Sequence, residues 1–110
     1  MLARQNRLLR AEDFRATMKA GRKIGSQHLV IYLKRVPGTA QARFGFVVGK
    51  NVGGAVNRNL VKRRLRAAAL TYIDVCNGDL VVRALPGAAQ LNWENLSTEF
   101  QQSINKALEK

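Results

Sequence analysis

The sequence is poor in cysteine, proline and acidic residues, and each shortage excludes a class of structure. Its single cysteine, Cys76, cannot form an intramolecular disulfide or a cysteine-based metal site. With 2 prolines and 46% hydrophobic residues, the chain of 110 residues is expected to fold rather than stay disordered. It has no run of about 18 apolar residues that would span a membrane, and its basic start lacks the apolar stretch of a secretory signal. We therefore expect one cytoplasmic domain over residues 1–110.

The shortage of acids leaves a large positive charge. The chain has 7 acidic against 19 basic residues, a net charge of +12 and an isoelectric point of about 11.2. No acid lies between Arg15 and Ile73, a stretch rich in lysine and arginine. Such a surface repels itself unless a polyanion neutralises it. Nucleic acid fits this requirement better than an anionic membrane, because the basic segments lack the bulky apolar face of a membrane-surface helix.

Hydrophobic periodicity predicts alternating helices and strands. Helices are expected over 11–20, 55–73 and 93–108, strands over 28–34, 42–48 and 80–84, and turns at 37–39 and 77–79. Because side chains alternate along a strand, the first two strands have an apolar core face and a mixed face that can stay open. That mixed face carries Val30, Tyr32, Lys34, Arg43, Gly45 and Val47. The order predicts an α/β sandwich with a small sheet.

The expected helix over 55–73 has two different faces. Its apolar side carries Val61, Leu65, Ala68 and Tyr72. Another side carries Arg58, Lys62 and Arg66, with Arg63 beside them. Like charges one turn apart destabilise a helix by a few tenths of a kcal/mol per pair, and the guanidinium fork suits two phosphate oxygens at once. This face is therefore predicted to bind nucleic acid.

The segment from Lys50 to Arg66 also contains a long motif of fixed spacing. It comprises a lysine, a glycine, Ala55-Val56, Arg58-Asn59, Lys62-Arg63 and a further arginine three residues on. This motif closely resembles the signature of the bacterial ribonuclease P protein subunit family. The resemblance extends over nearly the whole chain, through Asn6-Arg7-Leu8, Glu12-Asp13-Phe14, Arg43-Phe44-Gly45 and Asp79-Leu80-Val81-Val82.

The resemblance implies a fold, a partner and a reaction. The fold would be an α/β (α+β) two-layer sandwich of order α-β-β-β-α-β-α, with a small, mostly antiparallel sheet. The basic helix would lie in a left-handed βαβ crossover, a hand that pattern alone does not predict. The protein would bind a large catalytic RNA, and the complex would remove the 5′ leader of precursor tRNA. Mg2+ would be held mainly by the RNA and the substrate, and neither a membrane nor a further protein partner is implied.

Two RNA sites follow from the resemblance. The RNA subunit would contact Lys50, Arg58, Asn59, Lys62, Arg63 and Arg66. The single-stranded leader would lie in a cleft between the first helix and the open sheet face, against Phe14, Met18, Tyr32, Lys34 and Arg43. Aromatic platforms combined with cations suit a single strand, although core packing is an equal alternative for Phe14. Leu60 and Met18 depart from the family pattern, which usually has an arginine and an aromatic at these positions.

No residue of the chain is expected to perform catalysis. Metal-assisted phosphodiester cleavage needs clustered carboxylates or histidines, and the acids here are few and scattered. His28 stands alone and is expected to be structural, and Trp93 is expected in the core or near a helix cap. Two alternatives remain: a structural ribosomal-type RNA-binding protein, and a DNA-binding regulator using Asn57, Arg58 and Asn59 to read bases.

Overall fold

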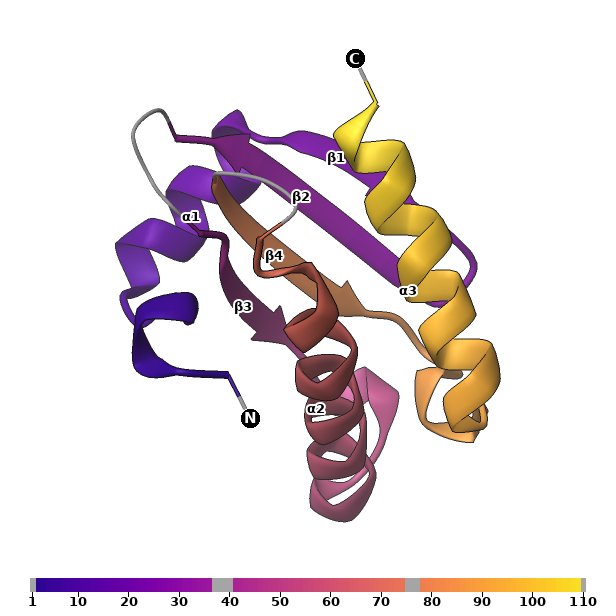
Figure 1. The fold of residues 1–110 in the computed structure, drawn as a ribbon. Coiled ribbons are helices and arrows are strands. Elements are labelled where there is room, and N and C mark those ends of the chain that lie inside the picture. The colour runs from indigo at the N-terminus through magenta and orange to yellow at the C-terminus, as the bar shows by residue number, and fades with distance from the viewer. Residues whose placement is uncertain (1, 37–40, 75–77, 110) are drawn as a thin grey trace.

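In a computed structural model, the chain forms three helices and a four-stranded sheet (Figure 1). The structure describes residues 2–36, 41–74 and 78–109, so the turn expected at 37–39, Cys76 and Asn77 lie outside the described residues. The elements are α1 (Ala11–Ala20), β1 (Arg22–Gly25), β2 (Leu29–Arg35), β3 (Arg43–Val47), α2 (Ala55–Ala69), β4 (Gly78–Ala84) and α3 (Trp93–Leu108). The expected order α-β-β-β-α-β-α is confirmed.

The sheet is mixed, with strand order β1-β2-β4-β3. β1, β2 and β4 pair in antiparallel fashion, whereas β3 pairs with β4 in parallel. The chain passes from β3 through α2 to the adjacent strand β4. In Figure 1, α2 lies in front of the sheet, β3 and β4 run downward, and β4 lies to the right of β3. The crossover is therefore left-handed, as the resemblance implied.

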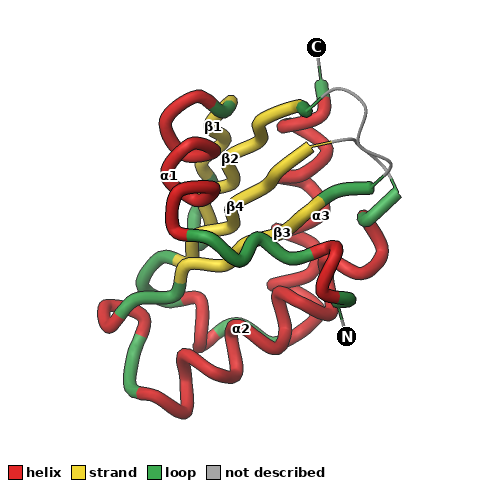
Figure 2. Tube along the Cα trace, turned by 90° about the vertical axis from the view of Figure 1, so that its left-hand side faces the viewer, coloured by secondary structure: helices red, strands yellow, loops and turns green. Residues whose placement is uncertain are grey.

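Helices cover both faces of the sheet (Figures 1 and 2). α2 and α3 enclose the main core on one face, where Leu29, Ile31, Phe44, Leu65 and Phe100 are fully buried. α1 lies over β2 and β4 on the other face. There a smaller cluster of Leu8, Tyr32 and Val81 is buried, with Phe14, Met18, Val30 and Val47 packed against it. The sheet face that the sequence predicted to be open is thus partly covered.

Two predicted boundaries were wrong for reasons of packing. α2 ends at Ala69 rather than at 73, and a short 3-10 helix (Leu70–Tyr72) continues the chain. Asp79 was expected in a turn, but it lies inside β4 and is 5% exposed because Arg43 of β3 pairs with it.

The structure adds one strand and decides the position of Trp93. β1 was not located, since Ile24 is its one large apolar residue and is only half-buried. Of the two positions expected for Trp93, the structure shows the one near a helix cap: Trp93 is the first residue of α3 and is 44% exposed. The N-cap is Asn92, whose side chain accepts a hydrogen bond from the Asn95 N–H at 2.8 Å. None of the helices within the described ranges has the length and apolar character needed to cross a bilayer.

Candidate nucleic-acid interface

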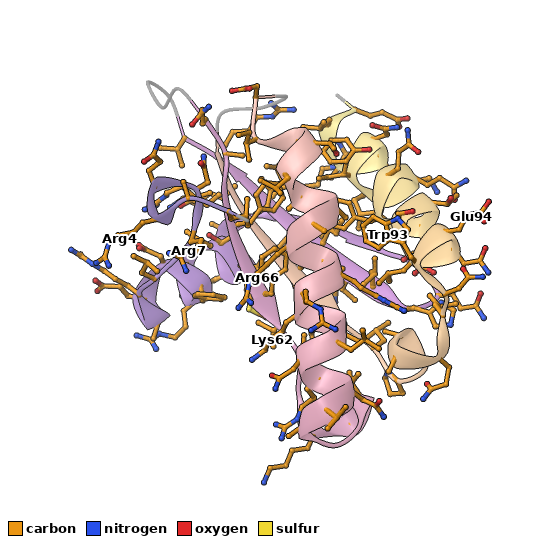
Figure 3. The ribbon with its side chains drawn as sticks, turned by 60° about the horizontal axis from the view of Figure 1, so that its bottom comes forward. Arg4, Arg7, Lys62, Arg66, Trp93 and Glu94 are labelled. Carbon is orange, nitrogen blue, oxygen red and sulfur yellow. The ribbon has the colours of Figure 1, made fainter. Side chains whose placement is uncertain are left out.

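A basic groove runs along α2. It is lined by Asn59, Lys62, Arg63, Arg66, Ala67 and Leu70 and has a volume of about 510 Å³. Lys62 and Arg66 project from the same side of the helix (Figure 3). No acidic side chain lines the groove, while Ala67 and Leu70 add an exposed apolar patch. The combination suits a nucleic-acid strand, which presents phosphates together with apolar ribose and base surfaces.

The opposite side of α2 explains this arrangement. Val61, Leu65, Ala68 and Ala69 are buried in the main core, and the helical repeat then turns the basic residues outward. The loop before α2 depends on Gly53, whose φ of 148° lies in the region that favours glycine. A Cβ at this position would also lie 3.1 Å from the Asn57 Cβ.

The structure does not place all six predicted contacts in the groove. Lys50 is exposed in the short 3-10 helix (Lys50–Val52) that precedes α2. Arg58 is half-buried, and its Nε is buried without a hydrogen-bond partner in the described part of the chain. An unpaired buried donor costs about 1–3 kcal/mol.

The flank of α2 toward α3 has a structural role. Arg64 donates from Nη1 to the Leu91 carbonyl oxygen at 2.6 Å and so ties α2 to the segment before α3. Leu60 lies one helical turn before Arg64 and is half-buried. It is not among the residues that line the groove. The position where the family usually has an arginine therefore lies outside the groove in this chain.

On the other face of the sheet, the predicted leader residues are brought together by packing. Phe14 and Met18 are half-buried against the cluster that contains Tyr32. Tyr32 itself is only 7% exposed, and the Lys23 Nζ lies 5.9 Å from its ring centre. The expectation that Tyr32 stands on an open face as a stacking platform was therefore wrong, because α1 and Leu8 cover it. Phe14 and Met18 retain partly exposed surfaces.

The predicted leader cation Arg43 is already paired. Its Nε and Nη2 each donate to a carboxylate oxygen of Asp79 at 2.8 Å, and Asp13 lies 3.9 Å from Nη1. The Asp79 hydrogen bond and charge raise the pKa of Arg43 despite partial burial. The Arg43 charge is thus largely compensated. The sequence pattern does not predict this pair, because Arg43 and Asp79 are 36 residues apart in the chain. Lys34, opposite Asp79 in the ladder, is half-buried.

A further cation, Arg83, lies on the same sheet face and was not among the predicted leader residues. Arg83 of β4 pairs in register with Val30 of β2 and with Val47 of β3, and it is exposed. Side chains of paired residues point to the same face of a sheet. Arg83 therefore places an exposed cation, which forms no ion pair within the described ranges, between two half-buried valines. The alternation of Val81 and Arg83 along the predicted strand could have identified it.

The single histidine is structural, as expected. His28 lies just before β2, and its Nδ1 is 2.8 Å from the Glu99 Oε1. Glu99 also accepts hydrogen bonds from the Ser26 hydroxyl and the His28 backbone N–H. Burial alone would raise the pKa of Glu99, but these hydrogen bonds and the His28 interaction lower it overall. Across the described ranges, histidine, cysteine, aspartate and glutamate form no group of three or more that could hold a metal ion.

A basic, apolar-lined helix groove beside a small mixed sheet defines a compact RNA-binding domain. The model of the Ribonuclease P protein family matches residues 2–108, and the chain belongs to this family. Its function is that of the protein subunit of ribonuclease P, rather than of a structural ribosomal protein or a DNA-binding regulator.

Relatives and solved structures agree with this assignment. The chain is 40% identical over 112 residues to the ribonuclease P protein component of Arthrobacter sp. (strain FB24), covering 100% of this chain and 82% of that protein. It is 41% identical over 118 residues to that of Streptomyces bikiniensis, covering 98% and 96%. In fold it is similar to the RNase P proteins of Staphylococcus aureus (TM-score 0.84, 23% identity, 94% and 95% covered) and Thermotoga maritima (0.81, 23%, 94% and 98%).

Proposed function

We propose that the chain binds the catalytic RNA subunit through the α2 groove and holds the 5′ leader of precursor tRNA beside α1, while the RNA carries the chemistry. The observation that carries the proposal is the convergence of Asn59, Lys62, Arg63 and Arg66 in one groove without an acidic neighbour. Such cations bind RNA largely by releasing condensed counterions from phosphates.

The distribution of the acids supports this role for α2. Glu12 pairs with Arg10, Asp79 pairs with Arg43, and Glu99 is held by Ser26 and His28. Asp74 accepts a hydrogen bond from the Gln41 amide at 2.8 Å. These carboxylates are engaged by other elements, so the α2 cations keep their charge available for a ligand.

For the leader, the proposal rests on the exposed remainder of the α1 side. Phe14 and Met18 present partly exposed surfaces beside the sheet, and Lys34 and Arg83 supply cations on the same face. Apolar surfaces that take bases and cations that track the backbone are the usual elements of single-strand binding. In this proposal Arg83, rather than Arg43, is the cation of β3 and β4 that contacts the leader backbone.

We propose that the chemistry belongs to the RNA, and the lack of a catalytic set among the described residues is consistent with this. The described residues supply no clustered metal ligands, and the contacts of His28 with Glu99 tie the segment before β2 to α3. Mg2+ would accordingly be held by RNA and substrate oxygens, which suit this hard cation. The protein's part is to bind and to position.

A matched pair of double variants tests the α2 groove. Lys62→Gln/Arg63→Gln removes two groove charges, whereas Lys19→Gln/Lys106→Gln removes two exposed charges from α1 and α3. We expect the groove variant to weaken binding to the RNA subunit roughly tenfold or more and to flatten the dependence of log K on log salt by about 1.8. The control should change little. Equal losses in both variants would show that only net charge matters.

A cleavage assay tests the division of labour. The purified protein without RNA should leave precursor tRNA intact at every Mg2+ concentration. With the RNA subunit it should accelerate leader removal most at low Mg2+, because its cations offset phosphate repulsion that Mg2+ otherwise screens. Site-specific leader removal by RNA-free protein would overturn the proposal.

A further inference from the structure

We propose that the cavity between the N-terminal segment and α1 is a separate binding site for RNA backbone phosphates. Its volume is about 650 Å³, and the arginines that line it are Arg4, Arg7, Arg10 and Arg43. None of the sites implied by the family signature includes Arg4, Arg7 or Arg10. The inference rests on the proposed function, because the RNA it would bind is the RNA subunit or the precursor.

The segment that carries these arginines is fixed to the sheet. Leu2, Asn6 and Leu8 are 3%, 3% and 5% exposed. The Asn6 side-chain amide donates to the Gln41 Oε1 at 3.2 Å and to the Ala42 carbonyl oxygen at 3.1 Å. The Leu8 N–H donates to the Phe44 carbonyl oxygen at 2.9 Å, beside an isolated bridge between Arg7 and Phe44.

Because Leu2, Asn6 and Leu8 are buried, the arginines between them are held at the surface. Arg4 and Arg7 are both exposed, and their backbone positions are set by the anchors on either side. A ligand would therefore meet two arginines on a backbone that is already ordered, and binding would cost less conformational entropy than binding to a flexible tail. Guanidinium groups suit phosphate, since each can donate to two oxygens at once.

The charges that line the cavity do not cancel. Arg43 is neutralised by Asp79, and Asp13, the acid on the cavity wall, lies 3.9 Å from Arg43. Arg10 pairs with Glu12 at 3.3 Å, but this pair is exposed and worth little in water.

Arg4 and Arg7 make no ion pair or side-chain hydrogen bond with another residue of the described ranges. They are therefore the cations in the cavity wall with charge to offer. Leu9, which is 55% exposed, gives the same cavity an apolar surface that a ribose or base can contact.

The cavity also lies on the side toward which the α2 cations point. Figure 3 shows Lys62 and Arg66 projecting from α2 toward the side on which Arg4 and Arg7 lie. Figure 2 shows the N-terminal segment passing along β3 above α2. An RNA bound in the α2 groove can thus continue past β3 to the arginine cavity, which favours a nucleic-acid strand over a small anion as the occupant.

The test compares two double variants in the full-length protein. Arg4→Gln/Arg7→Gln removes the unpaired cavity charges, and Lys19→Gln/Lys106→Gln removes two exposed charges elsewhere. One arm measures the affinity for the RNA subunit across a salt series. The other measures binding of leader-bearing precursor and of mature tRNA to the complex assembled with excess protein. Thermal unfolding is followed for every variant, and Arg4→Lys/Arg7→Lys keeps the charge without the fork.

The expected result is a loss of about tenfold in one arm, with the salt dependence of log K flattened by about 1.4 to 1.8. The control should stay near wild type, and the lysine variant should recover part of the loss. A loss in the first arm assigns the phosphates to the RNA subunit, and a leader-dependent loss in the second assigns them to the precursor. Losses no larger than the control's in both arms would overturn the inference.

The failure of this inference can be distinguished from that of the proposed function. Lys62→Gln/Arg63→Gln is measured in the same series. If that variant weakens RNA binding while Arg4→Gln/Arg7→Gln behaves as the control, the α2 groove is retained and the cavity is rejected. If the α2 variant behaves as the control as well, the proposed function itself is rejected.

Discussion

The ring of Phe14 lies directly on the backbone of Gly45. A Cβ built on Gly45 would come within 2.5 Å of the Phe14 Cε1 and Cζ atoms, and 3.2 Å from the Leu8 Cβ. Only a residue without a side chain permits this approach of α1 to β3. The sheet thereby sets the position of the aromatic ring that we assign to the leader.

Gly45→Ala should displace that ring. We expect a loss of stability of about 1–3 kcal/mol from overpacking, with weaker binding of leader-bearing precursor and little change for mature tRNA. Thermal unfolding and binding of both RNAs to the assembled complex measure this. Gly25→Ala is the matched control, because a Cβ there meets nothing within 4 Å. If the Gly45→Ala variant is destabilised but binds precursor as tightly as the wild type, Phe14 does not contact the leader.

Phe14 and Tyr32 should respond differently to truncation. Tyr32 is 7% exposed, so Tyr32→Ala is expected to cost about 3–5 kcal/mol of stability by leaving a cavity. Phe14 is half-buried. We therefore expect Phe14→Ala to leave the protein folded and to weaken the binding of leader-bearing precursor tRNA by about 1–3 kcal/mol. Binding is compared with mature tRNA at a temperature below the unfolding of either variant. An equal loss for both RNAs would show that the leader lies elsewhere.

The pair of Arg43 with Asp79 should act on stability. Asp79 is 5% exposed, so Arg43→Gln leaves a buried carboxylate without its partner at a cost of about 2–3 kcal/mol. Urea unfolding measures this, and Arg43→Gln/Asp79→Asn should recover part of the loss. Arg83→Gln, at an exposed cation of the same face, should change stability by no more than about 0.5 kcal/mol. Instead, Arg83→Gln should weaken precursor binding. If Arg43→Gln weakened precursor binding and Arg83→Gln reduced stability, Arg43 rather than Arg83 would be the cation that contacts the leader.

Leu60→Arg tests the departure from the family motif. Leu60 lies on the flank of α2 outside the groove, yet it is only half-buried. A long arginine there can reach RNA that extends over the edge of the groove, and we expect tighter binding to the RNA subunit with the salt dependence of log K steeper by about 0.9. Unchanged affinity together with a lower unfolding temperature would assign Leu60 to packing.

Glu99→Gln should destabilise the protein in a pH-dependent way. The pKa of Glu99 in the folded state is lowered from its ordinary value of 4.5. Its contribution is therefore fully present above about pH 4.5 and is lost as the pH falls through the folded-state pKa. The difference between wild type and variant should be about 1–3 kcal/mol near pH 7 and should shrink in acid. Glu94→Gln, exposed on the same helix, is the control. A pH-independent difference would contradict the assignment.

Much of the fold followed from local patterns. α1 and α3 were predicted with their observed bounds, Ala11–Ala20 and Trp93–Leu108, because their apolar residues recur at helical spacing. β1 (Arg22–Gly25) was missed since its stability comes from pairing with β2, which no local pattern records. The left-handed crossover was available only through the family resemblance, because pattern rules favour the opposite hand.

The sequence by itself determined the class of ligand and the element that carries the charge. A +12 chain whose long acid-free stretch includes a helix with Arg58, Lys62 and Arg66 on one side needs a polyanion. That conclusion depends only on composition and on the 3.6-residue period. Tertiary structure decided which cations are available, since Arg43 meets Asp79 across 36 residues and Arg64 meets Leu91 across 27. It also buried Tyr32 beneath α1 and gathered Arg4 and Arg7 around a cavity. Ion pairing and burial depend on contacts between distant segments, and a local pattern contains no information about them.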